Sequence, residues 1–190
     1  MLLSRFERYI MLHIIPPHER HHYTDMISQM FAHLDSESSK NTYQKDEFDT
    51  PEAVYCIYID DRFGLIGSAR LLPHPALLAG HIELEEDDDE DDYWECNRVF
   101  FDIHEDAPIH EEDPDAFREI TQQFYQELYK GIKGFTESYG INAVVFVNPV
   151  DEHEDILFFG QWPFDVESLI DIESNGEVST FAVGGCSFQR

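Results

Sequence analysis

The sequence predicts an α/β fold built around one sheet of mixed strand direction. Three observations support this prediction. Apolar residues recur at helical spacing in residues 18–34 and 114–139. Short runs rich in β-branched and aromatic residues lie between and after these two segments, and turn signals join several of the runs. At 190 residues with 42% hydrophobic residues, the chain suits one domain, residues 1–190, with a sizeable core.

The first segment, residues 5–15, is apolar and ends at two prolines. Its isoleucines and its tyrosine favour a strand over a short helix, because β-branched and aromatic residues suit strands. Residues 18–34 follow as a predicted helix, and their apolar positions share one face: Met26, Ile27, Met30, Phe31 and Leu34. Residues 35–50 are polar and predict a loop.

Four histidines gather around this helix: His18, His21, His22 and His33. A metal site would need ligands that converge on one point. A polar entry to the helix explains the same residues more simply, and we expect no metal site.

A β-hairpin is predicted next, from strand-forming residues 53–60 and 65–72 on either side of a turn. Another strand, residues 93–102, lies between two acidic loops. Residues 83–92 carry nine carboxylates in ten positions, and residues 104–115 are also acidic. Blocks of like charge repel themselves, which predicts solvated loops; a divalent-cation site in the first is an alternative without supporting motif spacing.

Residues 114–139 predict the longest helix, which Gly140 ends. Its apolar positions form one stripe: Phe117, Ile120, Phe124, Leu128, Ile132 and Phe135. Residues 142–147 predict a buried strand and residues 151–159 a short helix. Residues 165–187 predict two strands joined at an Asn-Gly turn signal.

Composition limits the partners. The net charge is −28, with only 12 Lys and Arg, which argues against binding to nucleic acid or to anionic lipid. A cationic ligand, a basic partner or simply a solvated acidic surface fits this charge. No 18-residue apolar run predicts a membrane span, and the N-terminus lacks the features of a signal peptide. Three scattered cysteines, Cys56, Cys96 and Cys186, predict neither a disulfide framework nor a zinc site, so we expect a cytoplasmic protein.

The strand at residues 93–102 contains Glu95 and Arg98 within an apolar, aromatic run. Ionisable groups are seldom placed on a buried strand unless they are paired or used. Residues three apart point to opposite faces of a regular strand, unless a local bulge brings them together. Two interpretations stand at this point: the floor of a functional site, or a structural ion pair at the end of a strand.

Three stretches carry a resemblance to a known family. They are Asp46-Glu47-Phe48-Asp49-Thr50-Pro51, Ile66-Gly67-Ser68-Ala69-Arg70-Leu71-Leu72-Pro73 and Trp94-Glu95-Cys96-Asn97-Arg98-Val99-Phe100. In this order they resemble the acyl-homoserine-lactone synthases, the autoinducer synthases of bacterial quorum sensing. The resemblance implies the fold of the GCN5-related N-acetyltransferases (GNAT), a three-layer α-β-α sandwich around a central mixed, mostly antiparallel sheet. It is best over residues 25–105.

The resemblance implies an acyltransferase that joins an acyl chain, carried by acyl carrier protein or coenzyme A, to the amine of S-adenosylmethionine. Lactonisation then releases methylthioadenosine, and no further cofactor is implied. Asp46 and Asp49 would supply negative potential for the cationic substrate, and Arg70 would bind its carboxylate. Glu95 would be the general base, directly or through a water, with Arg98 orienting these carboxylates. Phe100, Phe124, Val145 and Val147 would line an acyl pocket between the sheet and the long helix.

Two departures from the family pattern stand out. The family has an Arg, a Phe and a Trp in the stretch that corresponds to residues 25–36, which here contains no Arg and no Trp. An acidic acyl carrier protein would require a basic patch to dock on. In the later half of the chain, Lys130 and Lys133 form the only small basic patch that the sequence offers. The acetyltransferase phosphate loop is also missing after the strand at residues 93–102.

Two other functions therefore remain open. One is a GNAT-like N-acyltransferase that acts on another amine. The other is a catalytically inactive, synthase-like protein that binds a ligand or a basic partner, an interpretation that the missing Arg and Trp favour.

Overall fold

The computed structural model describes residues 10–37, 49–74, 93–101, 114–149, 168–174 and 177–187. The elements follow in the order β1 (Ile10–Ile15), the 3-10 helix η1 (Pro17–His22), α1 (Thr24–Glu37), β2 (Val54–Asp60), β3 (Gly64–Leu72), β4 (Tyr93–Phe101), α3 (Pro114–Tyr139), β5 (Ala143–Pro149), β6 (Ser168–Ser174) and β7 (Glu177–Ser187). The predicted loop at 83–92, most of the one at 104–115 and the predicted helix at 151–159 lie outside the described residues.

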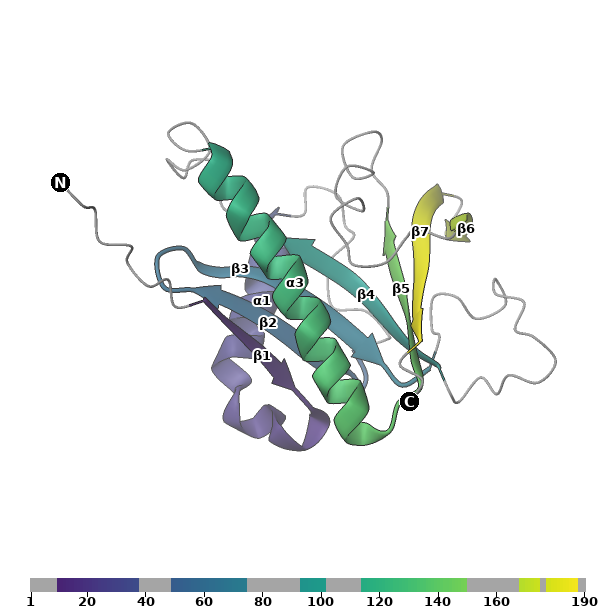
Figure 1. The fold of residues 1–190 in the computed structure, drawn as a ribbon, viewed down its shortest axis with the longest axis horizontal. Helices are drawn as coiled ribbons and strands as arrows, with labels where there is room; N and C mark the ends of the chain where they lie inside the picture. The colour runs from purple at the N-terminus through teal and green to yellow at the C-terminus, as the bar shows by residue number, and fades with distance from the viewer. Residues whose placement is uncertain are drawn as a thin grey trace.

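Seven strands form one sheet in the order β1-β2-β3-β4-β5-β7-β6. Every neighbouring pair is antiparallel except β4 and β5, which run parallel. Figure 1 shows α3 crossing one face of this sheet and α1 lying behind the other. The prediction of a three-layer α-β-α sandwich around a mixed, mostly antiparallel sheet is confirmed.

The main core lies between α3 and the sheet. The predicted stripe of α3 faces inward, with Ile120, Phe124, Leu128 and Ile132 fully buried. Phe124 meets Tyr58 of β2 edge to face, with ring centroids 5.0 Å apart. Gly67 of β3 lies directly beneath Phe124, where an added Cβ would approach the ring to within 2.6 Å. The helix therefore sits close to the sheet at this point.

A second, smaller core lies under α1, where Met30 packs on Ile15 and Ile57. The helix predicted at 18–34 differs from the structure at both ends. It opens as the 3-10 helix η1, becomes α-helical at Thr24 and extends to Glu37. Residues 35–37 were predicted as loop, but no Gly or Pro stops the helix there.

β4 and β5 start side by side and then diverge (Figure 1). Their pairing runs from Tyr93 opposite Ala143 to Asn97 opposite Val147. Beyond Asn97, the Asn148 side chain replaces the backbone hydrogen bonds between the two strands. Its Oδ1 accepts a hydrogen bond from the Val99 amide and its Nδ2 donates to the Val99 carbonyl, both at 3.0 Å. One side chain thus satisfies the backbone of β4 where its neighbour strand departs.

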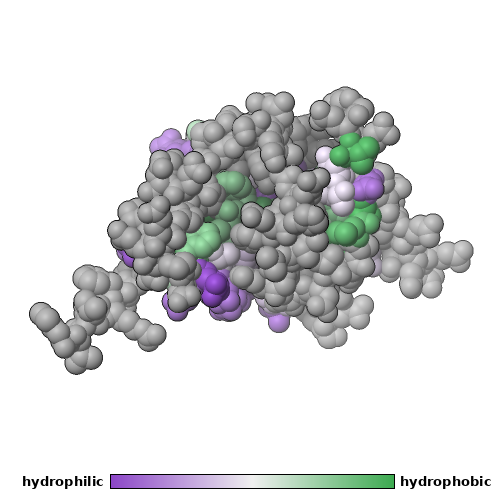
Figure 2. Space-filling model, turned by 90° about the horizontal axis from the view of Figure 1, so that it is seen from above, coloured by the Kyte–Doolittle hydropathy of each residue, from purple (hydrophilic) through white to green (hydrophobic). Residues whose placement is uncertain are grey.

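β6 forms one edge of the sheet. Leu169 on β6 and Val178 on β7 are 57% and 65% exposed. Figure 2 shows apolar surface at this end of the molecule. None of the helices in the described part of the chain combines the length and the apolar character that crossing a membrane requires.

Candidate active site

Three neighbouring strands place polar side chains in a row on the α1 face of the sheet. Tyr55 of β2 pairs with Arg70 of β3, and Arg70 pairs with Asn97 of β4. Glu95 lies two residues before Asn97 and shares its face. Arg70 is 2% exposed, and Glu95 and Asn97 are fully buried. Groups of this kind are rarely buried without partners, so their contacts define what the site can do.

Asp49, in the segment that precedes β2, lies at the centre of these contacts. Its Oδ1 is 3.1 Å from Nη1 of Arg70 and accepts a hydrogen bond of 3.1 Å from the Tyr55 hydroxyl. Its Oδ2 is 3.5 Å from Nη1 of Arg98. The Asp49 side chain is 1% exposed, so one carboxylate compensates two guanidinium groups away from water.

Asn97 completes the arrangement by joining Arg70 to Glu95. Its Oδ1 accepts a hydrogen bond of 2.9 Å from Nε of Arg70, and its Nδ2 donates to Oε1 of Glu95. We call Asp49, Tyr55, Arg70, Glu95, Asn97 and Arg98 the polar cluster. The sequence reasoning did not select Asn97, although an amide between a glutamate and an arginine in an apolar strand was the available signal.

A bulge in β4 brings Arg98 to the same face as Glu95. Ser68 pairs with Phe100 and Arg70 with Asn97, so Arg98 and Val99 together oppose Ala69 alone. Arg98 takes a φ of 51°, in the left-handed region that non-glycine residues seldom adopt. Of the two geometries that the sequence left open, the structure has the bulge. Backbone strain at this position costs on the order of 1–3 kcal/mol, and such strain is typical of functional sites.

Burial and the neighbouring charge keep the Tyr55 phenol protonated. Loss of solvent, followed by the negative charge of Asp49, raises the pKa of Tyr55 to about 12. Tyr55 therefore remains a hydrogen-bond donor to Asp49 at neutral pH.

Arg20 of η1 secures the segment that carries Asp49. Its Nη1 and Nη2 donate to the Thr50 carbonyl at 3.0 and 3.1 Å, and Nη2 also donates to the Ala53 carbonyl. Its guanidinium carbon lies 4.7 Å from the centroid of the Tyr55 ring. Sequence reasoning looked for a cation in residues 25–36 and missed this one, because the turn that carries Arg20 to β2 is not visible in the sequence.

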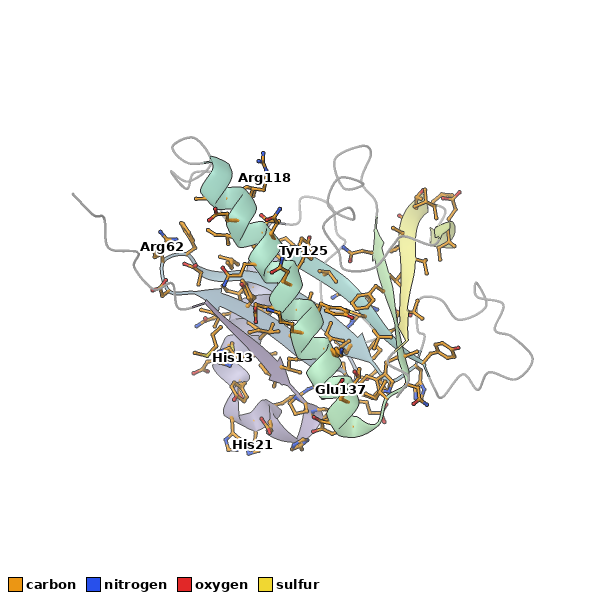
Figure 3. All side chains as sticks on the ribbon, viewed as in Figure 1. His13, His21, Arg62, Arg118, Tyr125 and Glu137 are labelled. Atoms are coloured by element: carbon orange, nitrogen blue, oxygen red, sulfur yellow. The ribbon has the colours of Figure 1, made fainter. Side chains whose placement is uncertain are left out.

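Of the five polar residues that the sequence singled out, the structure brings four together: Asp49, Arg70, Glu95 and Arg98. Asp46 lies outside the described residues. Other cations of the described chain lie elsewhere. Arg62 occupies the β2–β3 turn and Arg118 projects from the start of α3 (Figure 3).

The four proposed acyl-pocket residues do not share one space. Phe124 packs in the core under α3, whereas Phe100 packs with the cluster under α1. Val145 and Val147 alternate with Val144 and Phe146, which face α3, and so point to the opposite side of the sheet. A pocket between the sheet and α3 is therefore not lined by Phe100, Val145 or Val147, because strand alternation and the β4 bulge turn them away.

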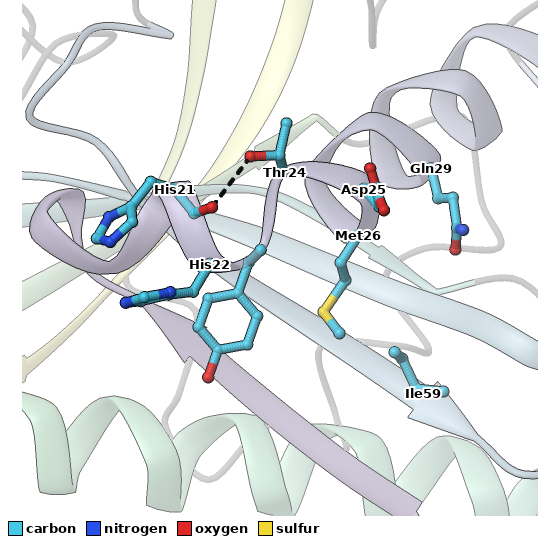
Figure 4. A pocket seen from close by; sticks show the side chains of 8 residues that line it. His21, His22, Thr24, Asp25, Met26, Gln29 and Ile59 are labelled. Atoms are coloured by element: carbon cyan, nitrogen blue, oxygen red, sulfur yellow. Dashed lines mark hydrogen bonds between the residues drawn. The ribbon is translucent and has the colours of Figure 1, made fainter.

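A pocket of about 510 Å³ lies apart from the polar cluster, at the junction of η1 and α1. Figure 4 shows its lining, which includes His21, His22 and Asp25. The rings of His21 and His22 lie with their centroids 3.8 Å apart and their planes tilted by 42°. Among the described residues, no group of three or more His, Cys, Asp or Glu side chains is placed to hold a metal ion.

Comparisons of sequence and of structure give different answers. No protein-family model matches the sequence, and no curated protein matches it. Solved structures do match the fold. BjaI, a CoA-dependent acyl-homoserine lactone synthase solved with SAM and isopentyl-CoA, is 18% identical with a TM-score of 0.57, over 96% of this chain and 85% of BjaI.

Two further structures show the breadth of this likeness. TofI is 13% identical with a TM-score of 0.57, over 94% of this chain and 90% of TofI. Arabidopsis thaliana NAA60, solved with acetyl-CoA, is 8% identical with a TM-score of 0.53, over 95% of this chain and 100% of NAA60. The chain therefore has the fold shared by acyl-homoserine lactone synthases and GNAT acetyltransferases.

Proposed function

We propose that the protein is an acyl-homoserine-lactone synthase-like acyltransferase, which acylates the amine of S-adenosylmethionine from an acyl thioester. The observation that carries this proposal is the polar cluster. Two carboxylates and two guanidinium groups from separate parts of the chain meet on one face of a sheet with an acyltransferase fold. They come from the three stretches on which the resemblance to the synthases rests.

Glu95 is the proposed general base. The substrate amine is an ammonium ion in water and must lose a proton before it can attack a thioester carbonyl. In the proposed reaction Glu95 takes this proton, directly or through a water. The amine nitrogen then bonds to the acyl carbon, the carbon–sulfur bond of the thioester breaks, and the leaving thiolate takes the second amine proton and departs as the thiol.

Arg70 and Asp49 are proposed to bind the amino-acid end of the substrate. The positive charge of Arg70 suits the substrate carboxylate, and the negative charge of Asp49 suits the sulfonium and ammonium groups. After acylation, attack of that carboxylate on the carbon next to the sulfonium closes the lactone. The carbon–sulfur bond breaks, and methylthioadenosine leaves with the bonding electrons.

The decisive experiment measures methylthioadenosine released from S-adenosylmethionine in the presence of a panel of acyl-CoA and acyl-carrier-protein donors. Glu95→Gln keeps the size and the hydrogen bond of the side chain but removes its basicity. We expect it to lower kcat by at least about 100-fold. Glu119→Gln, the same change at an exposed position of α3, is the matched control and should keep full activity.

Other outcomes separate the alternatives. A thioester-consuming activity that does not depend on S-adenosylmethionine would favour a GNAT-like N-acyltransferase with another amine. The likeness to NAA60, which was solved with acetyl-CoA, supports a thioester donor for this alternative. Binding of S-adenosylmethionine in a calorimetric titration, without turnover of any donor, would favour an inactive, ligand-binding protein. No binding and no turnover would contradict the proposed function.

The donor is proposed to be acyl-CoA rather than an acyl carrier protein. Carrier proteins are acidic and dock on basic surface. Of the two lysines that could form such a patch on α3, Lys130 is paired with Glu127 at 2.8 Å, and BjaI, whose fold this chain shares, is CoA-dependent. The same donor panel tests this, since the carrier-bound acyl chain should give the lower kcat/KM.

A further inference from the structure

We propose that Asn97 is a positioning residue, which holds the carboxylate of Glu95 in one orientation by joining it to the guanidinium of Arg70. The inference deepens the proposed function, because it assigns a role relative to the proposed base. It also makes a statement about Glu95 that can be measured without any substrate.

The position of the Asn97 side chain is fixed from two sides. Nε of Arg70 can only donate, so the atom that faces it at 2.9 Å must be the amide oxygen. The amide nitrogen is then left to donate to Oε1 of Glu95. Asn97 is fully buried, and its backbone is the last of β4 to pair with β5, opposite Val147. A rotation of the amide would place donor against donor at Arg70.

The charges around Asn97 explain why an amide stands there. A cationic donor at Glu95 would stabilise the carboxylate and weaken it as a base, whereas an amide N–H is a neutral donor. Nη1 of Arg70 is 3.1 Å from Asp49, which provides a compensating carboxylate, and Nε of Arg70 donates to Oδ1 of Asn97. At Oε1, Glu95 receives the neutral N–H donor of Asn97.

The remaining titratable groups near Glu95 fit this division. Arg98 pairs with Asp49, and Tyr55 donates to Asp49. Cys96, on the other face of β4, is held as a neutral thiol, because burial first, and then Cys56 and Glu95, raise its pKa. The Asn97 amide thus connects Oε1 of Glu95 to Nε of Arg70.

In the proposed reaction the amide can serve both states of the base. The proton from the substrate ammonium goes to Oε2 of Glu95, and Oε1 becomes the carbonyl oxygen of the carboxylic acid. Nδ2 of Asn97 can donate to Oε1 before and after this transfer. The carboxyl group therefore does not have to rotate during the reaction, which preserves its alignment with the amine.

The first test uses Asn97→Asp, which is isosteric and places a second carboxylate beside Glu95. Like charges at this distance oppose ionisation, so the acidic limb of the pH profile of kcat should move to higher pH by about one unit or more. Asn97→Ser removes both hydrogen bonds; it should lower kcat by about 10- to 100-fold and change the KM for S-adenosylmethionine by less than about 3-fold. Asn142→Asp, an exposed site just before β5, is the matched control and should leave the profile in place.

The second test needs no turnover. Carboxyl ¹³C NMR of glutamate-labelled protein, with the Glu95 signal assigned through Glu95→Gln, follows the titration of this one side chain. We expect the titration to move to higher pH in Asn97→Asp and to move also in Asn97→Ser, each in a variant whose circular dichroism shows the native fold.

The outcomes separate the two proposals. If the wild type neither binds S-adenosylmethionine nor turns over, but the Glu95 titration moves as stated, the proposed function fails and the role of Asn97 stands. If the Glu95 titration is the same in wild type, Asn97→Asp and Asn97→Ser, the role of Asn97 is overturned, whatever the activity. If only one of the two Asn97 variants folds, the Glu95 titration in that variant tests the role of Asn97. If neither variant folds, Asn97 is required for stability and the positioning role is overturned.

Discussion

At the scale of single residues, Asp49 decides how the polar cluster is stabilised. It faces Arg70, Arg98 and the Tyr55 hydroxyl at once, while Glu95 is reached through Asn97. Two formal negative and two formal positive charges therefore lie close together, three of them buried and that of Arg98 with 14% of its side chain exposed. Removal of one member of such a set lowers the free energy of unfolding strongly, because it leaves a charge without its partner. The cluster should accordingly be sensitive to small changes at its neutral members.

Tyr55→Phe tests this sensitivity and has a defined pH dependence. Loss of the hydroxyl leaves Asp49 with one donor fewer, at a cost of about 1–3 kcal/mol in the free energy of unfolding near neutral pH. In the wild type the pKa of Tyr55 is about 12 when folded against 10.0 unfolded. As pH rises from 10 to 12 the unfolded state loses this proton first, so the stability of the wild type falls.

The difference in unfolding free energy between wild type and Tyr55→Phe should therefore shrink as pH rises. Chemical denaturation of both proteins at about pH 8 and about pH 11 measures it. The comparison with Phe at this one position removes the contributions of other alkaline groups, such as Tyr58 and Cys56. A difference that stays constant or grows with pH would contradict the raised pKa of Tyr55.

The residues of the cluster differ in how far the sequence could predict them. Glu95 and Arg98 were visible as charges in an apolar strand, but their common face was not. That face depends on the register shift between Ser68 and Arg70 on the neighbouring strand, which no local pattern of β4 contains. The resemblance supplied Asp49 and Arg70, whereas Tyr55 and Arg20 carried no signal, since tyrosine is common in strands and arginine is common on the surface.

At the scale of elements, α3 is the part of the fold that its own sequence specifies best. Its bounds, Pro114 and Tyr139, agree with the prediction. Proline suits the first position of a helix, and Gly140 adopts a φ of 72° just after the last turn, where the Ile141 amide donates to the Thr136 carbonyl at 2.9 Å. α1 lacks such signals after its last turn, and its predicted end was wrong by three residues, 35–37.

The packing of α3 on the sheet can be tested with two glycines of opposite expectation. Gly67→Ala would bring a Cβ to 2.6 Å from the Phe124 ring and 3.0 Å from the Phe100 carbonyl, so we expect a loss of about 1–3 kcal/mol in unfolding free energy. Gly134→Ala, on the exposed side of α3 with nothing within 4 Å of the added Cβ, should stabilise by up to about 1 kcal/mol.

Thermal or urea unfolding of the two variants beside the wild type gives both values. Equal and small changes in unfolding free energy for the two variants would mean that Phe124 lies farther from Gly67 than in the structure. Because both changes are Gly to Ala, the reduced freedom of the unfolded chain is the same in each and cancels in the comparison.

At the scale of the whole molecule, the excess of 40 acidic over 12 basic residues sets the potential around the site. Charges beyond the Debye length, roughly 10 Å at 0.1 M salt, are screened, whereas buried charges are screened much less. The pairs within the polar cluster should therefore persist in salt, while the long-range field of the acidic surface should not. This field attracts a cationic substrate and repels an anionic one.

For the proposed reaction, salt should thus act in opposite directions on the two substrates. S-adenosylmethionine carries a net positive charge, so its dissociation constant should rise as salt increases. Acyl-CoA is a polyanion that the acidic surface repels, so its KM should fall over the same range until screening is complete.

Calorimetric titration measures the dissociation constant of S-adenosylmethionine, and initial-rate kinetics measure the KM of acyl-CoA. Both are carried out in KCl and in potassium glutamate at equal ionic strength, which separates screening from specific binding of chloride. Opposite slopes in both salts are expected, because the same field acts on two ligands of opposite sign. Parallel slopes would mean that each ligand responds to charges in its immediate surroundings, and that the net charge of −28 does not govern access to the site.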